Sequence, residues 1–147
     1  MAIHDCRTFA NDVAELRPMS QWLRGVADAA GVDPDTSFAA ELCLNEAAAN
    51  IITHGFRDGA SHAIRIDLEA GDGGLRLTMV DDGQAFNPLQ VEAPASATSL
   101  DDASVGGLGI PLMRVYASDL RYRRDGDHNV LVLTFGHRPP QQAEAPA

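Results

Sequence analysis

The alternation of apolar and polar residues predicts strands in adjacent pairs. In chain order, the predicted strands are residues 8–10, 63–70, 75–80, 120–124 and 130–135. A glycine-rich turn at residues 71–74 joins one pair as a hairpin, and residues 125–129 close the other. Because each paired strand has one apolar and one polar face, we expect a sheet that buries one of its faces.

A periodicity of three to four residues predicts a first helix that begins at about Asp12. Its apolar positions are Val13, Leu16, Met19, Trp22 or Leu23, Val26 and Ala27. Pro18 lies inside this pattern, so it either occupies the first turn or kinks the helix, which leaves the start open by several residues. Gly31 ends the helix, and Trp22 is expected in the core.

A second predicted helix has two unlike faces. Asp33 is expected to cap it, Pro34 takes the first position, and the helix runs to about Thr53 before Gly55 ends it. One face is a stripe of mostly small apolar residues that suits close packing on strands: Ala40, Leu44, Ala47, Ala48 and Ile51. The other side carries three polar residues at a spacing of four: Glu46, Asn50 and His54.

The region after the first hairpin follows neither periodicity. Residues 81–88 leave the sheet abruptly, and residues 89–104 are rich in Ala, Ser, Pro and Asp. A loop of this length is usually functional or mobile, and here it could close over a nucleotide as a lid. A third helix is expected after the glycines at 106, 107 and 109, with Pro111 in its first turn.

The predicted helices and strands do not alternate singly. Their order is helix, helix, strand, strand, loop, helix, strand, strand, which favours an α+β fold with helices on one face of a mainly antiparallel sheet. The 147 residues fit a single domain, predicted to span residues 1–137. The tail of mostly Pro, Gln and Ala at residues 138–147 is expected to be disordered.

Charge and cysteine content restrict the possible partners. Lys and Arg number 11 against 21 Asp and Glu, and the formal net charge of -10 argues against direct nucleic-acid binding and against an anionic membrane surface. An acidic surface can still bind a basic patch on a protein partner. Cys6 and Cys43 are too few for a disulfide framework and are expected as thiols in a reducing compartment. Because no signal peptide or membrane-spanning apolar run is seen, we expect a cytoplasmic protein.

Three patches carry candidate chemistry. Glu46 and Asn50 place a carboxylate and an amide one helical turn apart, which suits a magnesium-dependent phosphoryl site or an ordinary polar helix face. Asp81, at a strand end, could accept a hydrogen bond from an exocyclic amine such as that of adenine, or it could cap its own turn. Gly107 and Gly109 could approach phosphate oxygens or form a tight turn.

In order and spacing, these patches resemble the three nucleotide boxes of the GHKL ATPase/kinase superfamily. The matching residues are Glu46-x3-Asn50-x3-His54-Gly55-Phe56, Asp81-x-Gly83-x2-Phe86-Asn87-Pro88 and Gly107-x-Gly109-Ile110. The His-Gly-Phe and Phe-Asn-Pro segments are most similar to those of anti-sigma-factor serine kinases. The resemblance covers roughly residues 13–135 and implies a Bergerat-type α/β sandwich that binds Mg-ATP between the helices and the lid.

The resemblance also implies roles for individual residues. Asn50 would hold Mg²⁺, and Glu46 would be the general base for an incoming Ser hydroxyl. Asp81 would contact the adenine amine, with Gly83 close to the base. The remaining nucleotide contacts would come from Phe86, Gly107, Leu108 and Gly109, with the two glycines at the phosphates.

The same resemblance implies a partner-switching role. Proteins of this kind bind a sigma factor, often as homodimers, and phosphorylate a Ser or Thr of a small antagonist protein. The unphosphorylated antagonist removes the kinase from the sigma factor. A histidine kinase or a gyrase-like ATPase is disfavoured, because no helical hairpin with a phosphoacceptor His and no transducer domain is seen in the sequence.

The segment that would form the lid departs from some members of the superfamily. Residues 84–105 contain no Lys or Arg that could grip the γ-phosphate. Arg17, on the first helix, is the candidate substitute, and the alternative is a solvated helix residue. Without a clamp, turnover could be slow, or the chain could be a non-catalytic, nucleotide-gated module that holds a regulatory protein.

Two further groups of polar residues leave a choice open. His54 could line the site, or it could pack at or cap the end of its helix. The basic residues Arg121, Arg123 and Arg124 are expected as one solvated strand face that could contact a partner.

Overall fold

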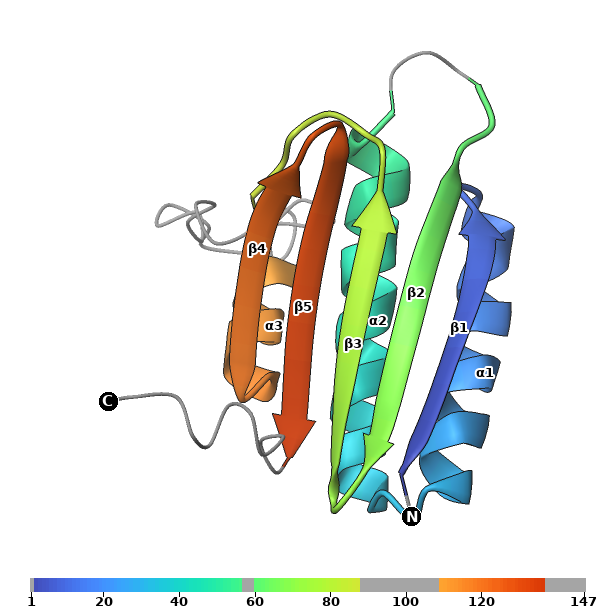
Figure 1. The fold of residues 1–147 in the computed structure, drawn as a ribbon, viewed down its shortest axis with the longest axis vertical. Helices are drawn as coiled ribbons and strands as arrows, with labels where there is room; N and C mark the ends of the chain where they lie inside the picture. The colour runs from blue at the N-terminus through green and yellow to red at the C-terminus, as the bar shows by residue number, and fades with distance from the viewer. Residues whose placement is uncertain (1, 57–59, 88–108, 137–147) are drawn as a thin grey trace, which may run out of the picture.

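The described part of the chain forms a five-stranded antiparallel sheet with helices on one face (Figure 1). A computed structural model describes residues 2–56, 60–87 and 109–136, without the side chains of 109–112. The strands are β1 (Ile3–Ala10), β2 (Ala63–Gly71), β3 (Gly74–Asp81), β4 (Asp119–Asp125) and β5 (His128–Gly136), in the spatial order β1-β2-β3-β5-β4. The α+β class with helices on one face of an antiparallel sheet, predicted from the sequence, is therefore confirmed.

Both predicted hairpins are present. β2 and β3 pair from Ile64 opposite Asp81 to Gly71 opposite Gly74. The two loop residues between them, Asp72 and Gly73, have φ values of 55° and 78°, as tight hairpin turns that follow the sheet twist require. β4 and β5 form the second hairpin, and β5 also pairs with β3, so the two hairpins share one continuous sheet.

The opening strand is longer than predicted. Only residues 8–10 were expected, but β1 begins at Ile3 and pairs along β2 to Ala10. Because β1 is an edge strand, it carries polar or charged side chains on both faces, including His4, Asp5 and Arg7. The alternation that marks a half-buried strand is therefore missing from its first half.

The first helix begins after a single turn of different geometry. Val13–Glu15 form the 3₁₀ turn η1, capped by the Asp12 side chain, and α1 spans Leu16–Ala29. The prediction of Val13 as a core position is wrong, because the tighter turn points its side chain outward and leaves it 65% exposed. The remaining periodic positions face the core, and Pro18 lies in the first turn without breaking the helix.

The helix α2 (Pro34–His54) has the ends and faces that were predicted from the sequence. The Asp33 carboxylate accepts a hydrogen bond from the Thr36 amide at 2.9 Å, Pro34 is the first residue, and Gly55 follows the last turn. Its apolar stripe lies against the sheet, with Ala40, Leu44, Ala47 and Ala48 buried and Ile51 partly buried. Two cross-helix contacts, Asn45 to Ser20 at 2.7 Å and Arg24 to Glu41 at 3.1 Å, join α2 to an antiparallel α1.

The third helix, α3 (Gly109–Tyr116), packs against α2 and leads into β4. β4 starts at the end of the sheet that is far from Asp81. Because α3 leads into β4, it begins nearer to Asp81 and runs toward that far end (Figure 1). The predicted lid at 89–104 and the predicted disordered tail at 138–147 lie outside the described residues.

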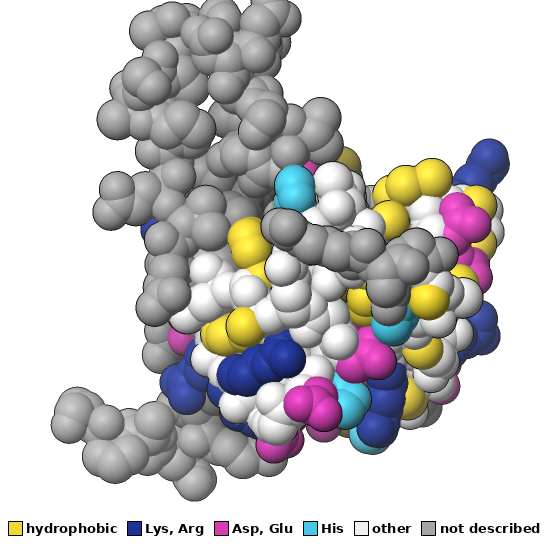
Figure 2. Space-filling model, turned by 90° about the horizontal axis from the view of Figure 1, so that it is seen from above, with side chains coloured by type: hydrophobic (Ala, Val, Ile, Leu, Met, Phe, Trp, Pro, Cys, Tyr) yellow, Lys and Arg dark blue, Asp and Glu magenta, His cyan; other side chains and the backbone are white. Residues whose placement is uncertain are grey.

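The surface at the Asp81 end of the sheet mixes charges of both signs. Figure 2 looks down on this end and shows basic, acidic and His side chains interspersed with apolar ones over the described residues. In the part of the chain that the structure describes, no helix is long and apolar enough to cross a membrane.

Candidate functional site

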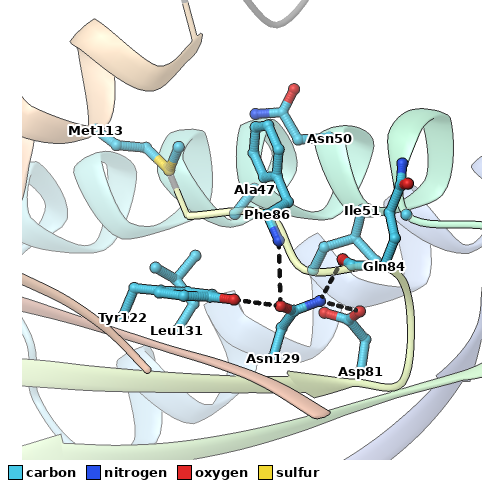
Figure 3. Close-up of a pocket in the computed structure, with 11 residues that line it drawn as sticks. Ala47, Asn50, Ile51, Asp81, Gln84, Phe86, Met113, Tyr122, Asn129 and Leu131 are labelled. Carbon is cyan, nitrogen blue, oxygen red and sulfur yellow. Dashed lines mark hydrogen bonds between the residues drawn. The ribbon is translucent and has the colours of Figure 1, made fainter. Parts of the chain in front are cut away.

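A cavity lies between α2, α3 and the Asp81 end of the sheet (Figure 3). Most of its wall is apolar or aromatic, and a few polar groups converge on it. The lining residues are Ala47, Asn50, Ile51, Gly55, Asp81, Gln84, Phe86, Met113, Tyr122, Asn129 and Leu131. A concave apolar slot with few convergent polar groups is the usual form of a small-molecule site.

The carboxylate of Asp81 is buried at the base of this cavity. Asp81 is the last residue of β3 and is 3% exposed. Its Oδ1 accepts hydrogen bonds from the Gly83 amide at 2.9 Å and from Asn129 Nδ2 at 3.0 Å. Among the described residues no group donates to Oδ2, so this oxygen is available to accept a hydrogen bond from a ligand.

Asn129 lies opposite Asp81 on the neighbouring strand, and it was not predicted as a site residue from the sequence. The two residues are register partners on β5 and β3. Asn129 Nδ2 also donates to the Gln84 carbonyl at 2.9 Å, and its Oδ1 accepts from the Tyr122 hydroxyl and from the Phe86 amide at 3.3 Å (Figure 3). No motif marks Asn129, because only the strand register brings it opposite Asp81.

Arg124 also joins this network, which corrects the prediction of one solvated arginine face. Its Nη1 donates to the Gly83 carbonyl at 2.8 Å and to Asn129 Oδ1 at 3.1 Å. Since side chains alternate along β4, Arg124 lies on the same face of the sheet as Tyr122, while Arg121 and Arg123 lie on the opposite face.

Gly83 is held where no larger residue fits. A Cβ at this position would lie 2.6 Å from the Gly55 carbonyl oxygen and 2.9 Å from Asp81 Oδ1. The next residue, Gln84, donates its backbone amide to the same Gly55 carbonyl at 2.8 Å. The loop after β3 is therefore fastened to the end of α2, and its backbone lies directly beside the cavity.

Asn50 contributes an amide without a partner to the cavity wall. It is 6% exposed on α2, and its Nδ2 makes no hydrogen bond to any described residue. An unpaired buried amide is costly, so such a group at a cavity usually has a ligand, an ion or water as its partner. The residues present therefore fit a bound group that carries polar atoms at this edge.

Glu46 and Arg17 lie outside the cavity lining. Glu46 is half-buried one turn before Asn50, and it has no hydrogen bond or ion pair with the described residues. Arg17 is exposed on α1. The cross-helix pairs place Arg17 level with Ala48 or Ala49, between Glu46 and Asn50 along α2.

The structure describes only some of the aromatic and glycine residues in the predicted nucleotide boxes. Phe86 is half-buried in the cavity wall, and its ring stacks at 6.4 Å on that of the exposed His54. His54 itself is not a lining residue. Gly109 is the first residue of α3, whereas Gly107 and Leu108 lie outside the described residues. Met113, which the motifs did not include, anchors α3 in the cavity and is 1% exposed.

Comparison with known proteins identifies the kind of domain that carries this cavity. The profile of the histidine kinase-like ATPase domain matches residues 9–135. The chain belongs to this family. It is 37% identical over 120 residues to the serine/threonine-protein kinase BtrW from Bordetella bronchiseptica, and the match covers 82% of this chain and 84% of BtrW.

A solved structure shares the fold of this histidine kinase-like ATPase domain. The structure of the RsbU and RsbW domains of Rv1364c from Mycobacterium tuberculosis matches 95% of this chain with a TM-score of 0.62 at 20% identity. This chain spans 33% of the length of that one. The family identifies ATP as the nucleotide, and the apolar slot with a carboxylate at its base and an unpaired amide at its edge is compatible with a purine nucleotide.

Proposed function

We propose that this chain is an ATP-dependent protein-serine/threonine kinase and an anti-sigma factor in a partner-switching system. One observation carries the nucleotide-binding part: Asp81 Oδ2 and Asn50 Nδ2, neither of which has a hydrogen-bond partner among the described residues, belong to residues that line the same apolar cavity. The first can accept a hydrogen bond from the adenine amine. The second, an NH₂ donor, lies where phosphate oxygens of the nucleotide could accept its hydrogen bond.

Each residue of the site has a role in this proposal. Asp81 and the close backbone of Gly83 bind the adenine, while Leu131, Met113 and Tyr122 enclose its faces. The Asn50 amide oxygen would hold Mg²⁺, which takes few protein ligands when phosphates supply the others. Gly107 and Gly109, the second of which is the first residue of α3, would donate backbone amides to the phosphates.

Glu46 is proposed as the general base. Its half-buried carboxylate has no partner among the described residues, so it can accept the proton of an incoming Ser or Thr hydroxyl. That hydroxyl oxygen then bonds to the γ-phosphorus of ATP while the bond to the β-phosphate oxygen breaks, and ADP leaves. Arg17, level with this region of α2, is proposed to offset charge at the γ-phosphate.

The name of one relative supports the choice of kinase. The name of BtrW describes a serine/threonine-protein kinase, and the solved chain contains an RsbW domain. We propose that the substrate is a small antagonist protein phosphorylated on Ser or Thr, that the other partner is a sigma factor, and that the chain acts as a homodimer. The mixed charges of the described surface in Figure 2 suit protein partners.

A transfer assay tests the proposal. The purified protein is incubated with γ-labelled ATP, Mg²⁺ and lysate of its source organism, and labelled bands are tested for acid stability. We expect an acid-stable label on a small protein, lost with Glu46→Gln while ATP binding is kept. An acid-labile label, or a normal label with Glu46→Gln, would contradict the assignment.

A second function has one observation in its favour. Residues 84–105 contain no Lys or Arg, so the segment brings no cation to the γ-phosphate. If ATP binds but no protein in the lysate is labelled, the chain is better described as a nucleotide-gated module that holds a regulatory protein without phosphorylating it.

A further inference from the structure

The Asn129 side chain is the centre of a buried hydrogen-bond network that includes Asp81. It is 6% exposed and uses both ends of its amide. Nδ2 donates to Asp81 Oδ1 at 3.0 Å and to the Gln84 carbonyl at 2.9 Å. Oδ1 accepts from three donors: the Phe86 amide, the Tyr122 hydroxyl and Arg124 Nη1.

This network permits only one orientation of the amide. A half-turn about the last side-chain bond would place Oδ1 against the Asp81 carboxylate and the Gln84 carbonyl, so acceptors would face acceptors. It would also direct the NH₂ group at the Arg124 guanidinium. Asn129 therefore presents a fixed donor to Asp81, and the five contacts that fix it come from three segments of the chain: the end of β3, the loop after it, and β4.

The fixed donor determines which atom of Asp81 a ligand can use. Oδ1 is occupied by Asn129 Nδ2 and by the Gly83 amide. Both donors hold the carboxylate in one rotation. The remaining oxygen, Oδ2, is then the acceptor left for a ligand, and it belongs to a residue that lines the cavity.

We propose that Asn129 is a positioning residue that makes the site select a base with an exocyclic amino group, because it keeps Asp81 as a fixed acceptor. This inference rests on the proposed binding of ATP in this cavity. ITP is the informative competitor, since it differs from ATP in carrying a carbonyl in place of the amino group and a proton on the neighbouring ring nitrogen. Its carbonyl oxygen would face Asp81 Oδ2, so that one acceptor would face another.

The test compares the dissociation constants of Mg-ATP and Mg-ITP by calorimetry for wild type, Asn129→Ala and Leu131→Ala. Wild type should prefer ATP by about 10- to 100-fold, as expected for a hydrogen bond to a charged group. Asn129→Ala should reduce this preference to within about threefold, because Asp81 loses one of the two donors that fix its carboxylate and can then rotate. Leu131→Ala removes only apolar wall, so both nucleotides should weaken equally and the preference should persist.

Tyr122→Phe provides a milder variant in case Asn129→Ala does not fold. It keeps the ring that lines the cavity and removes one donor to Asn129 Oδ1. The ATP preference should fall part of the way toward that expected for Asn129→Ala.

The possible results separate the inference from the function on which it rests. If Asn129→Ala, or Tyr122→Phe in its place, weakens both nucleotides equally and keeps the wild-type preference, Asn129 is only structural and the inference is overturned. In that case the proposed nucleotide site still stands, because wild type prefers ATP, but Asn129 has no role in the preference. If wild type binds neither nucleotide, the proposed function fails and the inference fails with it.

Discussion

Two amides on α2 differ in one respect: Asn45 is satisfied and Asn50 is not. Asn45 Nδ2 donates to Ser20 Oγ at 2.7 Å and to the Glu41 carbonyl at 2.9 Å. Asn50 Nδ2 is buried without a partner among the described residues. Proteins usually satisfy buried amides, so an exception that lines a cavity calls for a ligand, ion or water that completes the bond. The same residue type in the same helix thus has a structural role in one case and a proposed binding role in the other.

This contrast predicts opposite results for two matched substitutions. Asn45→Ala should lower the free energy of unfolding by about 1 kcal/mol, because Ser20 loses its partner, and should leave ATP affinity near wild type. Asn50→Ala should leave the free energy of unfolding unchanged or raise it by up to about 1 kcal/mol, and should weaken Mg-ATP binding. Urea unfolding and calorimetry provide the two readouts. Equal ATP affinities in the two variants would remove Asn50 from the site.

The two cysteines should differ in reactivity. Burial, with a smaller contribution from the Glu46 charge, raises the pKa of Cys43 to about 12, while Cys6 is exposed on β1. Since the thiolate is the reactive species, a thiol reagent at about pH 8 should modify Cys6 rapidly and Cys43 only after unfolding. Rapid modification of both in the native protein would contradict the burial of Cys43.

At the scale of elements, the end of α2 and the loop after β3 are fastened together at glycines. The close approach of Gly83 to the Gly55 carbonyl is what brings the loop beside the cavity. Gly83→Ala should therefore destabilise the protein by about 1–3 kcal/mol, as overpacking against backbone does. Gly25→Ala, in α1 with nothing within 4 Å of the added Cβ, should stabilise it by about 0.5–1 kcal/mol.

The two glycine variants are compared by their urea unfolding midpoints and by ATP binding. Gly25→Ala should bind ATP as wild type does, because Gly25 is not among the residues that line the cavity. A Gly83→Ala protein as stable as wild type would mean that the loop moves away easily, and the tight junction with α2 would then have no energetic importance.

The contact between β1 and α1 should make stability sensitive to acid. The hydrogen bond from Trp22 Nε1, at 2.7 Å, is the main cause that lowers the pKa of Asp5 below its ordinary value of 3.8. The Asp5 carboxylate therefore binds a proton less readily in the folded state than in the unfolded state. As a result, its stabilisation of the fold is present above pH 3.8 and is lost as the pH falls through the lowered pKa.

Urea midpoints measured between about pH 5 and pH 3 test this coupling. Wild type should lose stability more steeply on acidification than Trp22→Phe, which keeps an aromatic ring beside Phe9 but has no donor for Asp5. Identical slopes for the two proteins would show that Asp5 does not contribute through this bond.

At the scale of the whole molecule, the sequence predicts what periodicity and turn chemistry encode. α2, both hairpins and the helix-covered face follow from patterns that repeat over many residues. The first half of β1 escapes detection because an edge strand needs no apolar face, and Val13 is misplaced because the 3₁₀ turn changes the period.

The candidate site could be predicted only in part. Motif spacing points to Asn50, Asp81, Gly83 and Phe86, which line or adjoin one cavity. It does not point to Asn129, whose contact with Asp81 joins residues 48 positions apart and depends on the pairing of β3 with β5. Tyr122 and Arg124 are hidden in the same way, since their roles depend on which face of β4 turns toward the helices.

The central claim is that the adenine of ATP binds at Asp81, and calorimetry of Mg-ATP with wild type and Asp81→Asn tests it most directly. The amide can still accept the hydrogen bond from Gly83, but its NH₂ group would face the adenine amine, donor against donor. We predict that affinity falls by about 10- to 100-fold while the nucleotide-free protein remains folded, as checked by its thermal unfolding. Wild-type affinity in a folded Asp81→Asn protein would contradict this account of the site.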